Sequence, residues 1–165
     1  MRNAMPILLG FIFLLTSVGV SAQKDEKNEI DTLIKAARFL EQTPFDKKAK
    51  DVRGWAIKWV IATDKVSVTV CSLLISGIDN KYKYSGEVFG QYTIGMAAFK
   101  LANPDKAKDE QTAQLAGIDS ALTSYEAMVK EQPKARNAFM EDLLAKRATG
   151  ALAQYVAEHN CKNKK

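Results

Sequence analysis

Histidine and cysteine are the residues best suited to metal or nucleophilic chemistry, and this sequence has very few of them. The single histidine, His159, stands two positions before Cys161, near the end of the chain. Two ligands are too few for a zinc site. The chain also has no haem-attachment, zinc-protease, serine-hydrolase or glycine-rich phosphate-binding motif. We therefore expect no metal, no cofactor and no catalytic residue that the sequence can name.

Adjacent carboxylates could act as a general acid and a general base. Asp109–Glu110 and Glu141–Asp142 are such pairs. Consecutive residues of a helix point in different directions, so the two members of a pair do not face each other. We expect surface charges here. An enzyme that uses carboxylates distant in the sequence stays the weakest functional alternative.

The first 22 residues have the pattern of a cleaved secretory signal peptide. Arg2 supplies a positive charge, residues 7–20 are mainly apolar, and Val20 and Ala22 suit a signal peptidase. The apolar run is shorter than the roughly 20 residues that span a bilayer, which argues against the alternative of a retained anchor. We therefore expect an exported protein, periplasmic or extracellular, that is not embedded in the membrane after cleavage.

Cys71 and Cys161 are the only cysteines, and we expect them to form a disulfide. Oxidising compartments favour such pairing in an exported chain. The bridge would close a loop of about 90 residues and stabilise the fold by about 2–4 kcal/mol. The alternative is that Cys71 is a free buried thiol, since cysteine packs well as a small apolar side chain.

The basic character of the chain lies mostly at its ends. The formal net charge is +5, and it falls to +4 without Arg2. Residues 162–165 carry three further lysines, so the body of the protein is near +1. Nucleic-acid binding needs basic residues clustered on one face. We see no such cluster and expect no nucleic-acid partner.

Apolar residues recur at helical spacing along most of the chain after residue 22. Residues 30–40 and 52–60 each carry an apolar stripe. Farther along the chain, Pro133 separates a long predicted helix from a helix over residues 134–147. A short last helix follows Gly150. The sequence therefore predicts an all-α fold: a bundle of six to seven mostly antiparallel helices in one domain, residues 23–161, with a basic tail, residues 162–165.

Residues 66–78 are compatible with either a strand or a helix. Valines at 66, 68 and 70 alternate with polar residues, as in a strand. However, Val66, Val70 and Leu73 also share one face of a helix. No second convincing strand is present, and a lone strand leaves its backbone groups unpaired. We therefore predict a helix from Val66 to Ile78.

The stretch from Val88 to Phe99 carries no charge, yet its 12 residues are too few to span a membrane. Apolar residues occupy all sides of this predicted helix, which is typical of a helix buried on most faces. We expect it to be the central helix of the bundle. Four of its larger side chains could instead line a pocket for a small apolar ligand: Phe89, Tyr92, Met96 and Phe99.

Two groups of aromatic residues lie outside this helix. Trp55 and Trp59 stand one helical turn apart, and we expect them to anchor the core, with an aromatic binding platform as the alternative. A loop with alternating lysines and tyrosines follows residue 80. This loop is the possible surface for a partner, and its residues are Lys81, Tyr82, Lys83 and Tyr84.

Three functions remain open on these observations. We favour a small exported helical protein that is a non-catalytic binding module for a protein partner. The first alternative is a carrier of a small apolar ligand held between helices, because such pockets are common ligand sites. The second alternative is an enzyme without a recognisable motif.

Overall fold

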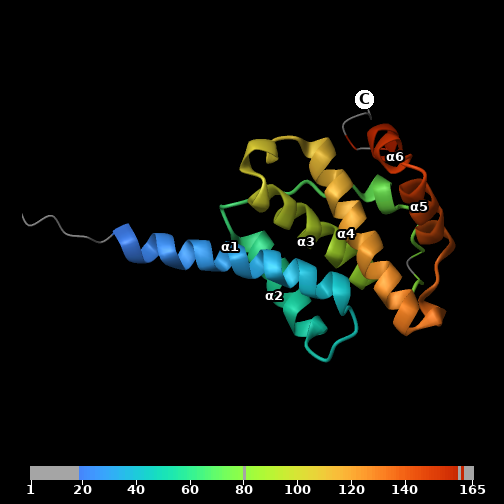
Figure 1. Ribbon diagram of the computed structural model, residues 1–165, viewed down its shortest axis with the longest axis horizontal. Coiled ribbons are helices and arrows are strands. Elements are labelled where there is room, and N and C mark those ends of the chain that lie inside the picture. The colour runs from blue at the N-terminus through green and yellow to red at the C-terminus, as the bar shows by residue number, and fades with distance from the viewer. Residues whose placement is uncertain (1–18, 80, 160, 162–165) are drawn as a thin grey trace, which may run out of the picture.

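The computed structural model describes residues 19–79, 81–159 and 161. Within these residues the fold is all-helical, without a strand, and forms one domain (Figure 1). The α-helices are α1 (Gly19–Gln42), α2 (Ala49–Ala62), α3 (Ser85–Ala102), α4 (Glu110–Glu131), α5 (Ala138–Ala148) and α6 (Leu152–His159). Short 3-10 helices form η1 (Ser72–Ile75), η2 (Pro104–Lys106) and η3 (Pro133–Ala135). The predicted all-α fold class is thus confirmed.

Capping side chains and prolines set the helix boundaries. The side chain of Asp109 accepts a hydrogen bond from the backbone N–H of Thr112 at the start of α4, at 3.1 Å. Asn137 caps α5 in the same way through the N–H of Met140. Such caps satisfy N–H groups that have no partner within the helix. Pro104 and Pro133 each open a 3-10 turn directly after a helix has ended.

Helices α3 and α4 form the centre of the bundle and make the most extensive contact between any two elements. Small residues allow this close approach. A Cβ atom added to Gly117 of α4 would lie 2.8 Å from the backbone oxygen of Tyr92, and it would collide with Met96. A Cβ atom added to Gly95 of α3 would collide with Ser120. The prediction that the stretch from Val88 to Phe99 is a central helix is confirmed, because most of its residues are buried.

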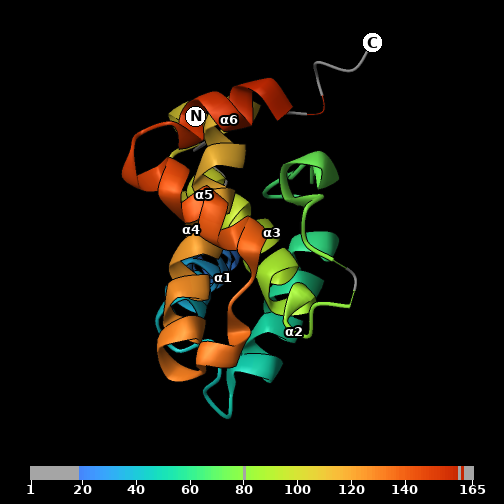
Figure 2. The same cartoon turned by 90° about the vertical axis from the view of Figure 1, so that its right-hand side faces the viewer.

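The other helices pack around this central pair (Figure 2). Helices α1 and α2 pack on one side, where Leu33, Leu40 and Val60 are buried with residues of α3. Helices α5 and α6 and η1 pack on the other, around Tyr92 and Tyr125. Two apolar clusters thus flank the central pair.

A buried polar contact fixes α1 against the central helices. The side-chain amide of Gln91 donates to the backbone oxygen of Ala37 at 3.1 Å and to the hydroxyl of Ser120 at 2.8 Å. That hydroxyl donates in turn to Glu41 of α1 at 2.6 Å. Because buried polar groups are costly when unpaired, these bonds help to specify how α1 lies on the bundle.

The predicted helix from Val66 to Ile78 is wrong. Residues 66–71 have no regular secondary structure and no bend, and η1 is the only helical part of residues 66–78. In Figure 1 a thin segment leaves the end of α2 and runs beside α3 to η1. We call residues 66–71 the extended segment. Side chains of α3 and α4 bind one of the two rows of its backbone groups, so this lone extended segment is not wholly unpaired.

Several predictions concern residues that the structure does not place. Of the expected signal peptide, residues 1–22, the first 18 lie outside the described residues, as does the tail 162–165, and the expected cleavage point after Ala22 falls within the range of α1. The mostly antiparallel arrangement and the cleavage stay predictions. No helix in the described ranges combines the length and apolar character needed to cross a membrane.

Candidate functional site

Three side chains from the central helices hold the extended segment. The ammonium of Lys100 donates to the backbone oxygen of Ser67 at 2.8 Å. The side-chain amide of Gln114 donates to the backbone oxygen of Thr69 at 2.6 Å. The backbone N–H of Cys71 donates to the hydroxyl of Tyr92 at 3.3 Å. The backbone of every second residue thus bonds to α3 or α4, as expected for an extended chain, in which alternate residues point to the same side.

The groups that bind the segment are themselves buried and paired. Lys100 is only 4% exposed, and its ammonium forms an ion pair with Glu110 at the start of α4. The hydroxyl of Tyr92 donates to the side-chain oxygen of Gln114. Burial raises the pKa of Tyr92 to about 12, and the nearby charge of Glu110 adds to this, so the phenol stays protonated and can donate near neutral pH.

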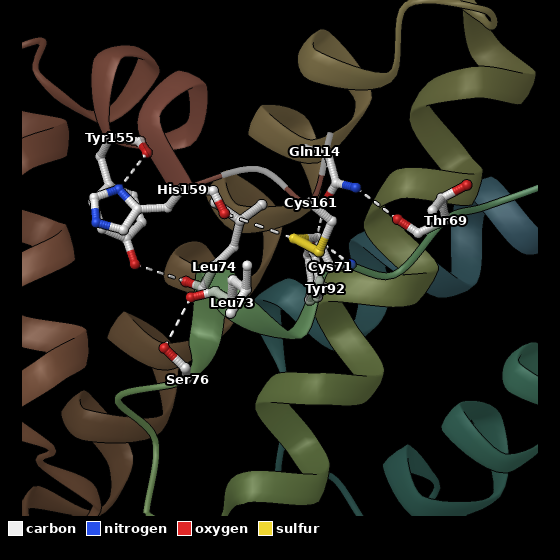
Figure 3. Close-up of a disulfide and its surroundings, with 10 residues drawn as sticks. All are labelled: Thr69, Cys71, Leu73, Leu74, Ser76, Tyr92, Gln114, Tyr155, His159 and Cys161. Carbon is white, nitrogen blue, oxygen red and sulfur yellow. Dashed lines mark hydrogen bonds between the residues drawn. A yellow bond between two sulfur atoms is a disulfide. The ribbon is translucent and has the colours of Figure 1, made fainter. Parts of the chain in front are cut away.

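A disulfide fixes the end of the extended segment. Cys71 and Cys161 are bonded, with their Cα atoms 5.6 Å apart, as the sequence predicted (Figure 3). The hydroxyl of Tyr155 in α6 donates to the backbone oxygen of Leu74 in η1 at 3.1 Å. The bridge and this hydrogen bond tie the last helix to the middle of the chain.

His159 belongs to this structural region. Its ring stacks on that of Tyr155, with centroids 4.3 Å apart, and its Nδ1 lies 2.9 Å from the backbone oxygen of Tyr155. No group of three or more potential metal ligands occurs in the part of the chain that the structure describes. Figure 3 shows that its neighbours include Tyr155 and Cys71, whose sulfur lies 3.7 Å from the backbone oxygen of His159.

An apolar groove of about 800 Å³ lies between α2, the extended segment and α3. Four large apolar side chains are exposed among the described residues, and three of them line this groove: Ile61, Val70 and Phe89. Ile61 is 79% exposed. The full lining is Ile57, Val60, Ile61, Thr63, Asp64, Val66, Ser67, Val68, Val70, Gly86, Phe89, Gly90 and Thr93.

Each lining element contributes a different part of the apolar groove. The last turns of α2 supply Ile57 and Ile61, and α3 supplies Phe89 between two glycines. The stem of Arg53 lies against Gly90, where an added Cβ would be 2.9 Å from its Cδ. Burial lowers the pKa of Arg53, and the carboxylate of Glu87 opposes this shift.

Three smaller hollows lie elsewhere. One of about 530 Å³ lies between α1 and α2 and includes the remaining exposed apolar side chain, Trp55, with lysines among its lining residues. Two others, of about 240 and 400 Å³, both border Phe99. None of these three gathers more than one exposed large apolar side chain. The apolar groove is therefore the strongest candidate site.

The four residues expected to line one apolar pocket are not brought together. Tyr92 and Met96 are fully buried in the packed contact between α3 and α4. Phe89 lines the apolar groove, and Phe99 borders two different hollows. The helix points these side chains in different directions, so only Phe89 belongs to the candidate site.

The possible partner surface after residue 80 is divided in the same way. Lys81 and Lys83 are exposed, but Tyr84 is buried and Tyr82 is half-buried. The hydroxyl of Tyr82 donates to the backbone oxygen of Ala135 at 2.6 Å, and that of Tyr84 donates to Gln132 at 2.8 Å. The tyrosines thus bind the connection between α4 and α5, which leaves only the lysines free to face a partner.

The two tryptophans also differ from each other. The indole N–H of Trp59 donates to Glu29 of α1 at 3.0 Å, and its ring is half-buried against the α1–α2 cluster. Trp55 is 38% exposed, so the prediction that both rings anchor the core is wrong for Trp55. It lies on the far side of α2 from the apolar groove, because it lines the hollow shared with α1.

Apart from Phe89, sequence reasoning did not identify the main residues of the candidate site. A usable signal existed for Ile57 and Ile61, which are one turn apart and off the apolar stripe of α2 that faces the core. No comparable signal marked Lys100, since its role depends on the position of Ser67. Comparison of the chain with family models, curated protein sequences and solved structures found no match.

Proposed function

We propose that the protein is an exported, non-catalytic binding module that docks an apolar segment of a partner protein in the apolar groove. The observation that carries this proposal is the gathering of Ile61, Val70 and Phe89 around one hollow. Isolated exposed apolar residues are normal, but a contiguous apolar patch is typical of an interaction site. Burial of such side chains against a partner gives about 25 cal/mol per Å² of apolar surface.

The exposure of Ile61 is the strongest single support. It lies in the last turn of α2, where a polar side chain would be compatible with the helix and with solvent. Its side chain is 79% exposed, so it packs little against the rest of the bundle. A large apolar side chain in that position is best explained by burial in a complex, since aliphatic anchors in a groove are a common mode of recognition.

Export is the second part of the proposal. The disulfide between Cys71 and Cys161 supports it, because such bridges persist in oxidising compartments and are rare in the cytosol. The pattern of residues 1–22 is the independent support from the sequence. Both together support a periplasmic or extracellular location.

A carrier of a small apolar ligand is the alternative. The volume of the apolar groove falls in the range of small-molecule sites, roughly 300–1,000 Å³. The groove lies between α2, the extended segment and α3 and is open to solvent, however, whereas the interior around Tyr92 and Met96 has no room for a ligand. The geometry therefore favours a partner segment over an enclosed ligand.

Photo-crosslinking tests this function at single positions. A benzophenone amino acid replaces Ile61 in the groove or, as the matched control, Trp55 in the other hollow beside α2. We expect irradiation in the producing cells to give a discrete protein adduct from position 61 and none from position 55. The yield of this adduct should fall when Phe89→Ser is introduced as well. Circular dichroism and an intact disulfide show that the variant is folded.

Other outcomes contradict the proposal. An adduct from position 55 with none from position 61 would move the site to the hollow between α1 and α2. A yield from position 61 that does not change with Phe89→Ser would mean that the contact does not use the apolar groove. An adduct with the mass of a small molecule would favour the carrier.

A further inference from the structure

The extended segment leaves one row of its backbone groups unpaired. Along an extended chain, the N–H and C=O of one residue point to the same side, and those of the next residue point to the opposite side. Ser67, Thr69 and Cys71 use one side to bind α3 and α4. Neither Val66 nor Val68 nor Val70 makes a backbone hydrogen bond to any residue that the structure describes.

The residues of this unpaired row belong to the lining of the apolar groove. Lys100 and Gln114 occupy the α3–α4 side of the segment, so the groups of the three valines point away from them. All three valines line the apolar groove, together with α2. A row of free donors and acceptors thus borders a hollow lined by exposed apolar side chains. Unpaired strand edges of this kind are templates for another chain.

We propose that the apolar groove binds an extended peptide, which adds as a strand along residues 66–70. This inference rests on the proposed function and names the conformation of the partner. A helix or a small apolar molecule could cover Ile61 and Phe89, but neither would satisfy three N–H groups and three carbonyls in a row. Only another extended backbone does both, as in other cases of strand addition.

The side chains around the groove indicate the peptide's composition. In an added strand, alternate side chains point to the same face, and these would lie between Ile61 and Phe89. Such residues should be apolar. Asp64 lies at the end of the groove where the segment begins, and its ion pair with Lys65 is solvent-exposed and therefore weak. A basic residue of the peptide at that end would complement it.

The segment is held in place at both ends, which favours binding. At its end, Cys71 is fixed by the disulfide and by Tyr92. Before its start, the N–H of Thr63 donates to the backbone oxygen of Trp59 at 2.9 Å, and the N–H of Lys65 donates to the hydroxyl of Thr63 at 3.2 Å. A template ordered in advance loses less entropy when a ligand binds.

N-methylated peptides test whether backbone pairing is used. The probes are fluorescent hexapeptides of the pattern K-b-T-b-T-K, in which b is Val, Ile, Leu, Phe or Tyr, and binding is measured by anisotropy. The best binder is then made in two isomers, methylated on both b nitrogens or on both threonine nitrogens. The isomers have the same composition, but only one presents free N–H groups to residues 66–70. We expect their affinities to differ by about tenfold or more.

Variants of the protein provide the matching control. Val70→Pro keeps an apolar side chain but removes one free N–H, and it should weaken binding about tenfold. Val70→Ile keeps that N–H and should bind like the parent protein. An unchanged melting temperature and an intact disulfide show that both variants are folded.

Failure of this inference can be told apart from failure of the proposed function. Equal binding of the two methylated isomers, weakened in both cases by Ile61→Ser, would overturn the strand inference and leave the apolar groove as the binding site. Absence of binding by every hexapeptide up to about 1 mM would also overturn it. Binding that Trp55→Ser weakens and Ile61→Ser does not would contradict both.

Discussion

Replacement of Lys100 by methionine should destabilise the protein, although it changes no residue of the two apolar clusters. Methionine keeps the length of the stem and removes the ammonium. The backbone oxygen of Ser67 then loses its donor, and Glu110 loses its partner. The Glu110 side chain is only 23% exposed, and one of its carboxylate oxygens already lacks a partner in the described residues. A buried charge would thus be left without compensation.

The size of the effect follows from these two losses. Removal of one member of a buried ion pair costs about 3–5 kcal/mol, and partial exposure of Glu110 places this case near the lower end. Loss of the bond to Ser67 is part of the same change and accounts for about 1 kcal/mol. We therefore expect Lys100→Met to lower the free energy of unfolding by about 3 kcal/mol.

A double-mutant cycle separates the two contributions. Lys100→Met, Glu110→Gln and the double variant are unfolded in urea with the disulfide intact, and tryptophan fluorescence is followed. The double variant should recover most of the loss, because the uncompensated carboxylate is gone, and about 1 kcal/mol for Ser67 should remain. The idea that Lys100 holds the extended segment would be refuted if each single variant lost less than about 0.5 kcal/mol in free energy of unfolding and the double variant lost only the sum of the two.

Three further predictions follow from the same structure. Cys161→Ser should cost about 2–4 kcal/mol in urea unfolding, because it opens a long loop; a cost below about 0.5 kcal/mol would show that the tail is not needed to order the fold. Gly117→Ala should destabilise by about 1–3 kcal/mol through collision at the α3–α4 contact, whereas Gly54→Ala, with open space around it, should stabilise by about 0.4–1 kcal/mol; equal melting-temperature shifts would contradict this. Burial raises the pKa values of Tyr92 and Tyr125 to about 12, above the ordinary value of 10, so the native state holds protons that the unfolded state releases. Their contribution to stability is complete below pH 10 and is lost as the pH rises toward 12. Urea midpoints should therefore decline from pH 8 to 12, and Tyr125→Phe should flatten this decline. A midpoint that rises in this range would contradict the predicted direction.

The helices could be predicted because their signals are local. The stripe of α1, the prolines after α3 and α4, and the uncharged run of α3 all lie within a few residues of the boundaries they set. The disulfide could be predicted because only two cysteines are present. Each of these predictions needs no knowledge of which segments meet in space.

The extended segment could not be predicted, because its backbone partners are distant in the sequence. Ser67 is bound by Lys100, and Thr69 by Gln114, which is 45 positions away. The assumption that a lone strand is wholly unpaired failed because side chains, not a second strand, supply the partners for one row of its backbone groups. A lysine within an apolar helix was the only hint, and it does not indicate which carbonyl the ammonium reaches.

The site residues were difficult for a related reason. Composition identified Phe89, Tyr92, Met96 and Phe99 as one group, but the helix distributes them over different faces. The hydroxyls of Tyr82 and Tyr84 find acceptors beyond α4, so the rings do not form a free platform. Which apolar residues stay exposed depends on what covers them, and a single sequence does not show this.

Amide NMR of the isotope-labelled protein tests the central claim most directly. The protein is titrated with the hexapeptide that binds best, and shifts and hydrogen exchange are recorded for the amides of Val66, Val68 and Val70. We predict rapid exchange in the free protein, and large shifts with slowed exchange of these three amides in the complex. Shifts centred on Trp55, or unchanged exchange at the three valines in the saturated protein, would contradict the claim that the apolar groove binds an added strand.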